Sequence, residues 1–316
     1  MTKRTGQNYC FPVTKLIAPA KINLRLKITG CRPDGYHLLD MIMVKLDLAD
    51  QVKFELTKEG IYLESDSDKV PCDRSNTLWK VVELVRQESR KKFGAKIFFR
   101  KRIPTAAGLG GGSSDAASLL LALRDQLGLD WSDEKLIQIG VRVGADVPFF
   151  LVQGAQKVQG IGEILTPLAL SELQQVEGLP LILINPGFPV STKEAFGWWD
   201  QGPHPASGHP LPLTGEGLGV RVGLTGAGLD AIPAQLENDL ERVVIPRYPV
   251  LSEIKELLIR VGAHGTLMSG SGATVFGLFE STALRDRGFE QIERLKKKNW
   301  WTWKGNSLGG EESNLD

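Results

Sequence analysis

A glycine-rich stretch that runs straight into a helical pattern constrains this chain more than any other feature. Residues 104–115 read PTAAGLGGGSSD, with three consecutive glycines ahead of two serines. Beyond Ser113, apolar residues recur at the spacing of one helix face, and Gly128 follows as a stop signal. The apolar positions of this face are Ala116, Leu119, Leu120, Leu123 and Leu127. The stretch predicts a glycine loop that ends at the start of a helix.

Such a loop is suited to binding phosphate. The first backbone N–H groups of a helix have no partner within it, and the helix dipole adds positive potential at the same point. Glycine allows the backbone to approach a ligand closely and to adopt positive φ angles. The alternative is a simple glycine turn, capped by Ser113, ahead of a core helix. Three consecutive glycines are a costly way to build such a turn, so we favour the phosphate loop.

The loop is neither of the two common nucleotide fingerprints. A Walker A loop ends in Gly-Lys-Ser/Thr, whereas Gly112 is followed directly by Ser113. A dinucleotide-binding fold has its glycines near the start of the domain and an acidic residue about 20 residues later, on a second strand. Here the loop begins at residue 104 and a helical pattern follows it. The sequence therefore predicts a phosphate site of another kind.

Composition restricts the classes of partner. The chain has 316 residues, enough for two domains, with 42% hydrophobic and 24% charged residues. A net charge of +1 gives no long-range field for nucleic acid or an anionic membrane. The three cysteines, Cys10, Cys31 and Cys72, have no metal-type spacing and indicate reduced thiols. With no apolar run near 18 residues and a polar start, we expect a cytoplasmic protein without a membrane span or signal peptide.

The first half of the chain mixes strand and helix signals. Residues 16–28 predict a strand pair interrupted by Pro19, and alternating polarity predicts antiparallel strands at 41–48 and 51–56. Ser75 or Asn76 is the expected cap of a helix that ends before Gly94. Further elements are expected as a strand at 97–99, the helix after the glycine loop, a helix from Ser132 to Gly144 and strands near 165.

The second half shows the same mixture, so the fold class is α+β with domains 1–165 and 166–316. Residues 202–228 are rich in glycine and proline, and we expect a flexible insertion there. A loose extension is expected at 1–14 and a frayed tail at 304–316. The elements between are predicted as a strand at 179–184, a helix at 250–261, a strand at 273–279, a helix to about 297 and a strand containing Trp300, Trp301 and Trp303.

Four short segments stand beside the glycine loop as possible carriers of chemistry. Residues 18–24 read APAKINL and place Lys21 and Asn23 on one strand face, although a lone lysine is more often a surface residue. Residues 34–37 read DGYH, which also suits a plain hairpin turn. Residues 144–150 read GADVPFF, and an aspartate among apolar residues is costly unless it is paired or functional. Residues 269–272 read SGSG, which is a second tight loop or a simple turn.

Taken together and in this order, the segments resemble the GHMP kinases, a family of small-molecule phosphotransferases. The resemblance covers roughly residues 16–280 and rests on the lysine strand, the central loop and the late SGSG loop. It implies an N-terminal domain like the second domain of a small-subunit ribosomal protein and a ferredoxin-like C-terminal domain, with the site between them. One departure is Thr105-Ala106-Ala107, where more glycine is common, although small residues remain.

The resemblance also implies catalytic roles. Asp146 matches the general base that takes the proton of the substrate hydroxyl, and Lys21 matches the cation that orients it. The cofactors implied are ATP and Mg²⁺, with N–H groups from Gly108 to Ser114 on the phosphates and Ser114 as a possible metal or phosphate contact. No metal ligand is assigned. The implied ATP-binding residues are Pro104, Thr105, Ala106, Ala107, Gly108, Leu109, Gly110, Gly111, Gly112, Ser113 and Ser114, with Asn76 and Lys101 near the adenine.

Within the family, the DGYH segment resembles the branch whose small-molecule substrate is a cytidine diphosphate methylerythritol, an isoprenoid precursor. Tyr36 and Phe196 match aromatic walls around the cytosine, and His37 matches the residue at its edge. Asn23 and Thr192 match further substrate contacts. The alternatives are a GHMP kinase for a sugar, homoserine or mevalonate-type alcohol, and an RNA-binding module, which the neutral charge opposes. We expect a monomer or weak homodimer.

Overall fold

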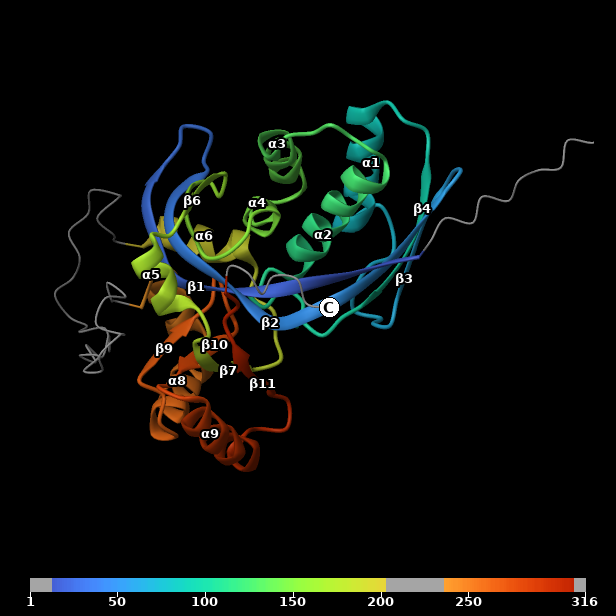
Figure 1. Cartoon of the computed structure of the whole chain (residues 1–316). Helices are drawn as coiled ribbons and strands as arrows, with labels where there is room; N and C mark the ends of the chain where they lie inside the picture. Colours follow the sequence, from blue (N-terminus) through green and yellow to red (C-terminus); the bar gives the residue numbers. More distant parts are fainter. Residues whose placement is uncertain (1–12, 203–235, 310–316) are drawn as a thin grey trace, which may run out of the picture.

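The computed structural model describes residues 13–202 and 236–309, which form two sheets with helices packed on them (Figure 1). The expected α+β class is confirmed. Apart from residue 202, the expected insertion at 202–228 lies outside the described residues, as does most of the expected extension at 1–14. In the part of the chain that is described, no helix is both long and apolar enough to cross a membrane.

Two long strands form the centre of the N-terminal sheet. β1 (Thr14–Cys31) and β2 (His37–Thr57) pair antiparallel from Thr14–Phe54 to Cys31–His37 and are joined by a turn in which Gly35 has φ +86°. The predicted interruptions at Pro19 and between residues 48 and 51 are therefore wrong. Pro19 instead borders a β-bulge, where the ladder shifts register before Lys21. A bulge tolerates proline because a regular ladder hydrogen bond is already missing there.

The remaining strands of this sheet extend it on both sides. Strand order is β3-β4-β2-β1-β8, with β5 paired to β2 and β6 paired to β5. Their bounds are β3 Ile61–Ser65, β4 Gly94–Arg100, β5 Gln156–Gly160, β6 Ile164–Pro167 and β8 Glu237–Asn238. The expected boundary at residue 165 falls inside β6, and β8 returns from the second half of the sequence to pair with β1.

Helices cover one face of the N-terminal sheet (Figure 1). They are α1 (Thr77–Ser89), α2 (Gly111–Gln126), α3 (Asp133–Val143) and the short α4 (Val147–Leu151). Of the two expected caps for α1, Asn76 is the one used, and Ser132 caps α3 as predicted. Helix α2 begins at Gly111, before the expected start, and its N-cap is Gly110. Ser113 is therefore inside the helix and does not cap it, because its N–H donates to the Gly110 carbonyl.

The C-terminal sheet has the order β11-β7-β10-β9 with antiparallel neighbours. Along the chain, β7, α8, β9, β10, α9 and β11 follow one another, which is the order of the ferredoxin-like fold that we expected. The strands are β7 Pro180–Asn185, β9 Gly265–Met268, β10 Val275–Leu278 and β11 Trp301–Asn306. The helices of the second half are α5 Leu170–Val176, α6 Thr192–Gln201, α7 Glu241–Val244, α8 Val250–Arg260 and α9 Thr282–Leu295. A 3₁₀ turn, η2 Ile245–Arg247, lies between α7 and α8. The expected tail from residue 304 is wrong at its start, because β11 continues to Asn306 and Ser307 bridges to Leu46.

The middle of β1 is buried on both faces, which explains the unusual APAKINL sequence. Ala20, Ile22 and Leu24 pack into a core shared with the C-terminal sheet, including Leu181 and Phe276. Because side chains alternate along a strand, Lys21 and its neighbour two residues on point to the opposite face, under the helices. The sheet thus carries polar groups into the space between helices and C-terminal domain.

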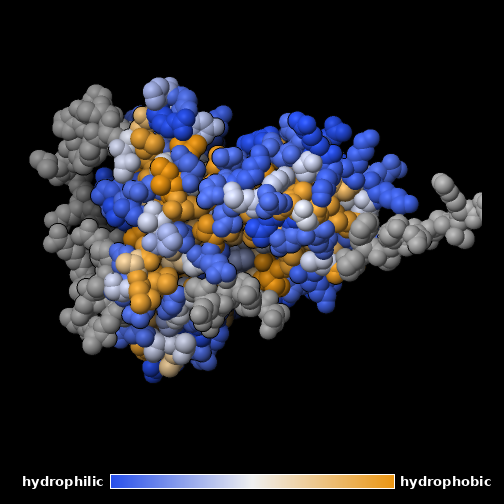
Figure 2. All heavy atoms as spheres, turned by 45° about the horizontal axis from the view of Figure 1, so that its top comes forward, coloured by the Kyte–Doolittle hydropathy of each residue, from blue (hydrophilic) through white to orange (hydrophobic). Residues whose placement is uncertain are grey.

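The outer surface gives no sign of one large apolar interface on the face that Figure 2 shows. Hydrophilic side chains cover much of the end that carries α1 and β4, and small hydrophobic patches lie between them. The exposed large apolar residues of the described part of the chain are Val13, Tyr36, Tyr62, Ile164, Leu170, Ile259 and Leu295. Single exposed apolar residues of this kind are normal for a globular protein.

Candidate active site

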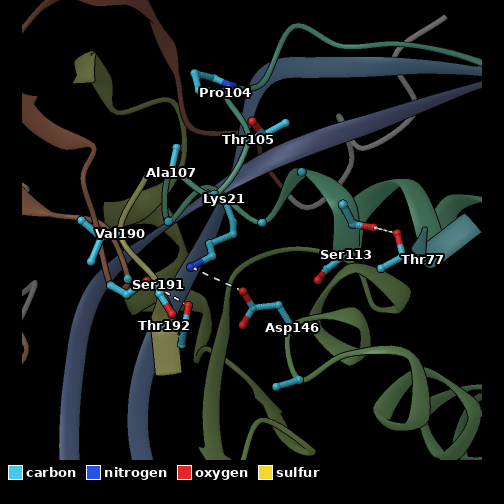
Figure 3. Close-up of a pocket in the computed structure, with 18 of the residues that line it drawn as sticks. Lys21, Thr77, Pro104, Thr105, Ala107, Ser113, Asp146, Val190, Ser191 and Thr192 are labelled. Carbon is cyan, nitrogen blue, oxygen red and sulfur yellow. Dashed lines mark hydrogen bonds and ion pairs between the residues drawn. The ribbon is translucent and has the colours of Figure 1, made fainter. Parts of the chain in front are cut away.

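A pocket of about 540 Å³ lies where the glycine loop, the middle of β1 and the start of α6 meet (Figure 3). Of the site residues proposed from the sequence, most line it; the four that do not are Leu109, Ser114, Tyr36 and His37. Residues that the sequence places more than 200 positions apart, such as Lys21 and Ser271, share this lining. The pocket is therefore built by both halves of the chain.

The two glycine-rich loops are packed against each other. Gly108 has φ +76°, and a Cβ added there would lie 2.0 Å from the Ser269 carbonyl oxygen. The Ser269 hydroxyl donates to the Gly108 carbonyl at 2.9 Å, and Asn238 donates to the Gly270 carbonyl at 2.8 Å. Glycine at residue 108 is thus required both by its φ angle and by the close approach of the second loop.

The start of α2 opens on the pocket as a phosphate site requires, but with fewer free groups than expected. The N–H groups of Ser113 and Ser114 both donate to the Gly110 carbonyl, at 3.0 and 2.9 Å, so they are not available to a ligand. Gly111 and Gly112 occupy the first two positions of the helix, whose N–H groups have no intrahelical acceptor. These two residues line the pocket, and helix-start N–H groups of this kind are suited to binding an anion.

The two serines behave differently. Ser114 is fully buried, its hydroxyl has no hydrogen-bond partner within the protein, and it is not part of the pocket lining. The expectation that Ser114 contacts metal or phosphate stays a prediction, for a hydroxyl that lies behind the pocket lining. Ser113 lies in the lining, and Figure 3 shows its hydroxyl on the same side as Asp146. It is the serine that a ligand at the helix start would meet.

Lys21 and Asp146 come together from β1 and from the turn before α4, as expected. Lys21 Nζ lies 3.7 Å from Asp146 Oδ2 and donates to Asn23 Oδ1 at 2.6 Å. The lysine side chain is 4% exposed, whereas that of Asp146 is 36% exposed. Burial lowers the pKa of Lys21, an effect that the charge of Asp146 opposes. The pair combines a fixed, buried cation with a carboxylate that solvent and substrate can reach.

Lys101 has closer partners than Lys21. Its Nζ bonds Asp50 of β2 and, at 2.8 Å, Asp115 of α2, and its side chain is 7% exposed. Burial alone would lower the pKa of Lys101, but Asp115 and Asp50 outweigh this and raise it. Burial raises the pKa of Asp115 to about 7, with a smaller contribution from Asp50 and with Lys101 opposing it. Lys101 thus joins β2, β4 and α2 behind the phosphate loop.

The proposed adenine-side residues lie at the pocket wall but are already hydrogen bonded. Asn76 caps α1, since its Oδ1 accepts from Leu78 N at 2.9 Å, and its Nδ2 donates to the Pro71 carbonyl at 2.7 Å. Thr77, which sequence reasoning missed, donates to the Gly112 carbonyl at 2.9 Å and so joins α1 to the glycine loop. The position of Thr77 in the sequence, directly after the cap residue of α1, did not predict this contact.

Of the residues proposed around the cytosine, His37 of β2 packs against Phe196 of α6. Phe196 stacks on His37 with ring centroids 4.6 Å apart, and His37 Nε2 lies 2.7 Å from Asp200 Oδ1. Thr192, which lines the pocket with Phe196, shares a hydrogen bond with Ser271 at 3.0 Å. Tyr36 is 61% exposed and stands outside the lining. The structure therefore joins His37 and Phe196 but leaves Tyr36 apart from them.

Several residues at the site were not selected from the sequence. Asp200 could have been found from its spacing, because Thr192, Phe196 and Asp200 are four residues apart and share one helix face. Asp115 had a comparable signal, since it is an acidic residue on the apolar face of α2. The contacts of Asp50 depend on tertiary packing, and its local sequence gave no indication of them; Ser271 lies in the SGSG loop singled out from the sequence, but its contact with Thr192 was not predicted.

The similarity to known proteins agrees with this geometry. The GHMP kinases N terminal domain matches residues 76–154 and the GHMP kinases C terminal domain matches residues 222–298. A 4-diphosphocytidyl-2-C-methyl-D-erythritol kinase from Geobacter sp. (strain M21) is 41% identical over 91% of this chain and 96% of its own length. The enzyme of the same name from Geobacter sulfurreducens is 42% identical over 90% of this chain and 96% of its own length.

Solved structures show the same fold. A 4-(cytidine 5'-diphospho)-2C-methyl-D-erythritol kinase superposes with a TM-score of 0.73 at 31% identity, covering 94% of this chain and all of that one. A homoserine kinase from Cytophaga hutchinsonii gives a TM-score of 0.67 at 18% identity over 98% of both chains, which supports the fold alone. On the family matches and on relatives above 40% identity across nine-tenths of its length, the chain belongs to the GHMP kinases, a family of small-molecule kinases.

Proposed function

We propose that this protein transfers the γ-phosphoryl group of ATP to the 2-hydroxyl of 4-diphosphocytidyl-2-C-methyl-D-erythritol, a step of the non-mevalonate route to isoprenoid precursors. The observation that carries the proposal is the Lys21–Asp146 pair, which lies in one pocket with the start of α2 and with Phe196. The names of relatives that are 41% and 42% identical support the identity of the alcohol.

Each member of the Lys21–Asp146 pair has its own role in the proposed reaction. The hydroxyl must lose a proton as it attacks phosphorus, and Asp146, whose side chain is partly exposed, is the carboxylate that takes it. Lys21, fixed by Asn23, holds Asp146 in place and stabilises the alkoxide that develops on the attacking oxygen. The N–H groups of Gly111 and Gly112 hold the transferred phosphoryl group and need no reorganisation during the reaction.

The donors at the site fit a magnesium ion that is bound mainly by nucleotide and water. Among the described residues no group of three or more His, Cys, Asp or Glu side chains could hold a metal ion. Mg²⁺ in kinase sites commonly uses one or two carboxylates with substrate phosphates and water, and Asp146 and the Ser113 hydroxyl offer such donors. When bound, the ion would neutralise charge on the phosphates.

Cytosine recognition is the part of the proposal that requires movement. A base between Tyr36 and Phe196 needs the His37 ring to leave its stack on Phe196, because the two ring centroids are only 4.6 Å apart. His37 would then meet the edge of the base while its Nε2 stays on Asp200. Tyr36 is free to turn inward, since its side chain packs little against the protein.

We infer that the enzyme works in the cytoplasm on small molecules. ATP and a cytidine diphosphate alcohol are its expected partners, and a net charge of +1 supports no role for nucleic acid. We propose a monomer or weak homodimer.

A coupled assay of ADP release tests the function. Purified protein with ATP and Mg²⁺ is given, in separate reactions, the cytidine diphosphate methylerythritol, homoserine, mevalonate and galactose. We expect turnover with the cytidine compound and a kcat/KM at least about 100-fold lower with the others, since the site's aromatic and polar groups would have no partner. Preferred turnover of homoserine, mevalonate or galactose would reject the substrate while leaving the kinase assignment intact.

A further inference from the structure

Lys45 is a buried cation that the reaction described above does not use. It lies on β2, its residue is 6% exposed, and burial is the cause that lowers its pKa to about 8. Among the described residues it takes part in no ion pair within 4 Å, unlike Lys21 and Lys101. Burying an ammonium group without a carboxylate is costly, so its presence requires an explanation from its contacts.

Those contacts are with α4, the short helix that follows the proposed base. Lys45 Nζ donates to the carbonyl oxygen of Val152, the residue directly after the helix, at 2.6 Å. The same ammonium lies 5.6 Å from the ring centroid of Phe149, within the range of a cation–π contact. Helix ends leave carbonyl oxygens without an intrahelical donor, and Lys45 supplies one here.

The opposite end of α4 is held by the other lysine. Asp146 is the N-cap residue of α4 and is paired with Lys21. Lys21 on β1 and Lys45 on β2 are directly opposed in the antiparallel register. Opposed residues share one face of a sheet, so the two ammonium groups rise side by side to the two ends of one five-residue helix.

Like charges at opposed positions of a strand pair are unfavourable, and an apolar residue at 45 would avoid both this repulsion and the burial of charge. The arrangement therefore has a cost that the fold of the sheet alone does not explain. It is explained if α4 must be held at both ends, because α4 carries the proposed base and Phe150, whose ring lies beside Gly110 and the Lys21 stem.

We propose that Lys45 is a positioning residue for phosphoryl transfer: by holding the carboxyl end of α4, it keeps Asp146, at the amino end, within reach of Lys21 and the substrate hydroxyl. This inference rests on the proposed function in one respect, the role of Asp146 as the base. Lys45 touches neither substrate nor nucleotide, since it does not line the pocket. Its effect should therefore fall on kcat.

The test compares Lys45→Met with Lys53→Met, which removes an exposed lysine from the same strand. For Lys45→Met we expect kcat to fall about 10- to 100-fold, the scale of small misplacements of a catalytic group. Both KM values should stay within about 3-fold, because the pocket lining is unchanged. Lys53→Met should match the wild type. A folded Lys45→Met protein with wild-type kcat, or one whose loss lies in KM, would overturn the inference.

Two further measurements separate positioning from a merely structural role. In the Asp146→Asn background, adding Lys45→Met should change the residual kcat by less than about 2-fold, because the lysine acts through the missing base. A second full loss in the double variant would contradict this. Amide hydrogen exchange over residues 147–152 should be faster in Lys45→Met than in the wild type, with unchanged exchange in α2; equal exchange over 147–152 would also count against the inference.

The exchange measurement also separates this inference from the proposed function. If the wild-type protein phosphorylates none of the alcohols but α4 loosens in Lys45→Met, the function fails and the hold on α4 stands. Should Lys45→Met not fold, Lys45→Gln, which keeps a polar donor without charge, takes its place in all three measurements. The glutamine side chain is shorter and reaches the Val152 carbonyl less well, so we expect a smaller loss of kcat in the same direction. The same two results, wild-type kcat or unchanged exchange, would overturn the inference.

Discussion

Two lysines, Lys21 and Lys101, line the same pocket but differ in how closely they are paired with carboxylates. Lys101 is held between two buried carboxylates, Asp50 and Asp115, which are 0% and 5% exposed. Lys21 lies 3.7 Å from one carboxylate, Asp146, which is 36% exposed. A cation held between two buried carboxylates is suited to fixing structure, because its charge is already neutralised within the protein. A loosely paired, accessible carboxylate keeps an oxygen for a substrate proton. The difference in pairing and exposure distinguishes the proposed catalytic pair from the structural one.

The largest effect should come from neutralising the accessible carboxylate. Asp146→Asn keeps the shape of the side chain and removes its basicity, so we expect kcat to fall about 10²- to 10⁴-fold with little change in melting temperature. Asp133→Asn, which alters an exposed residue at the start of the neighbouring α3, is the control. Lys21→Ala should be similarly impaired, and the double variant should lose little more, since the two groups act as a unit. Wild-type turnover by a folded Asp146→Asn protein would remove the base assignment.

Substitutions in the Lys101 cluster, which consists of Lys101, Asp50 and Asp115, should mainly lower the free energy of unfolding. Asp50 accepts hydrogen bonds from Lys101 and from the N–H groups of Arg102 and Ile103, the latter two at 2.6 and 2.9 Å. Asp50→Ala leaves the lysine short of a partner in a buried site and should lower the free energy of unfolding by about 3–5 kcal/mol.

Asp66→Ala is the matched control for that variant. Asp66 also accepts from the Lys101 region, at the backbone N–H, but its side chain is 36% exposed, and its loss should cost about 1 kcal/mol. Urea unfolding gives both numbers. If Asp50→Ala were as stable as the wild type but inactive, Lys101 would belong with the catalytic groups and the contrast with Lys21 would be lost.

The comparison also shows what the sequence could and could not reveal. Lys21 and Asp146 were predictable through the family resemblance, because the segments APAKINL and GADVPFF match its motifs, whereas Lys21 alone was more readily interpreted as a surface lysine. The ferredoxin-like order of the C-terminal half followed from the family resemblance. The partners of Lys101 were not predictable, because Asp50 and Asp115 reach it through the pairing of β2 with β4 and the packing of α2. The long strands were misread for a related reason: Pro19 resembles a strand break locally, and only the bulge in the β1–β2 ladder accommodates it.

A smaller effect, on pH dependence, should also separate the two lysine sites. Burial raises the pKa of Asp115 to about 7, so the folded protein binds this proton more tightly than the unfolded chain does. Its contribution to stability is complete below the ordinary aspartate pKa of about 3.9 and is lost as the pH rises through about 7. We expect the free energy of unfolding to fall between pH 5 and pH 8, and this fall should be reduced in Asp115→Asn.

The control for that measurement is Asp125→Asn, a change at a 63% exposed aspartate on the same helix. Its stability should follow the wild-type dependence on pH. Lys101 does not confuse the comparison, because its pKa is raised from an already high value and it stays charged throughout this range. Parallel curves for wild type and Asp115→Asn would show that the proton is not bound at Asp115.

The smallest expected effect lies beside the pocket, where Tyr36 is exposed and His37 stacks on the pocket residue Phe196. If cytosine is bound there, Tyr36→Ala loses a base–aromatic stack worth about 1–3 kcal/mol, so KM for the alcohol should rise about 5- to 150-fold. KM for ATP should stay nearly constant, because Tyr36 does not line the pocket near the glycine loop. Tyr62→Ala removes a similarly exposed tyrosine from β3 and should change neither value.

A uridine analogue should have a lower kcat/KM than the cytidine compound, because a carbonyl replaces the amino donor of the base. Equal kcat/KM values for the cytidine and uridine compounds, together with an unchanged KM for the alcohol in Tyr36→Ala, would mean that the enzyme does not recognise the base.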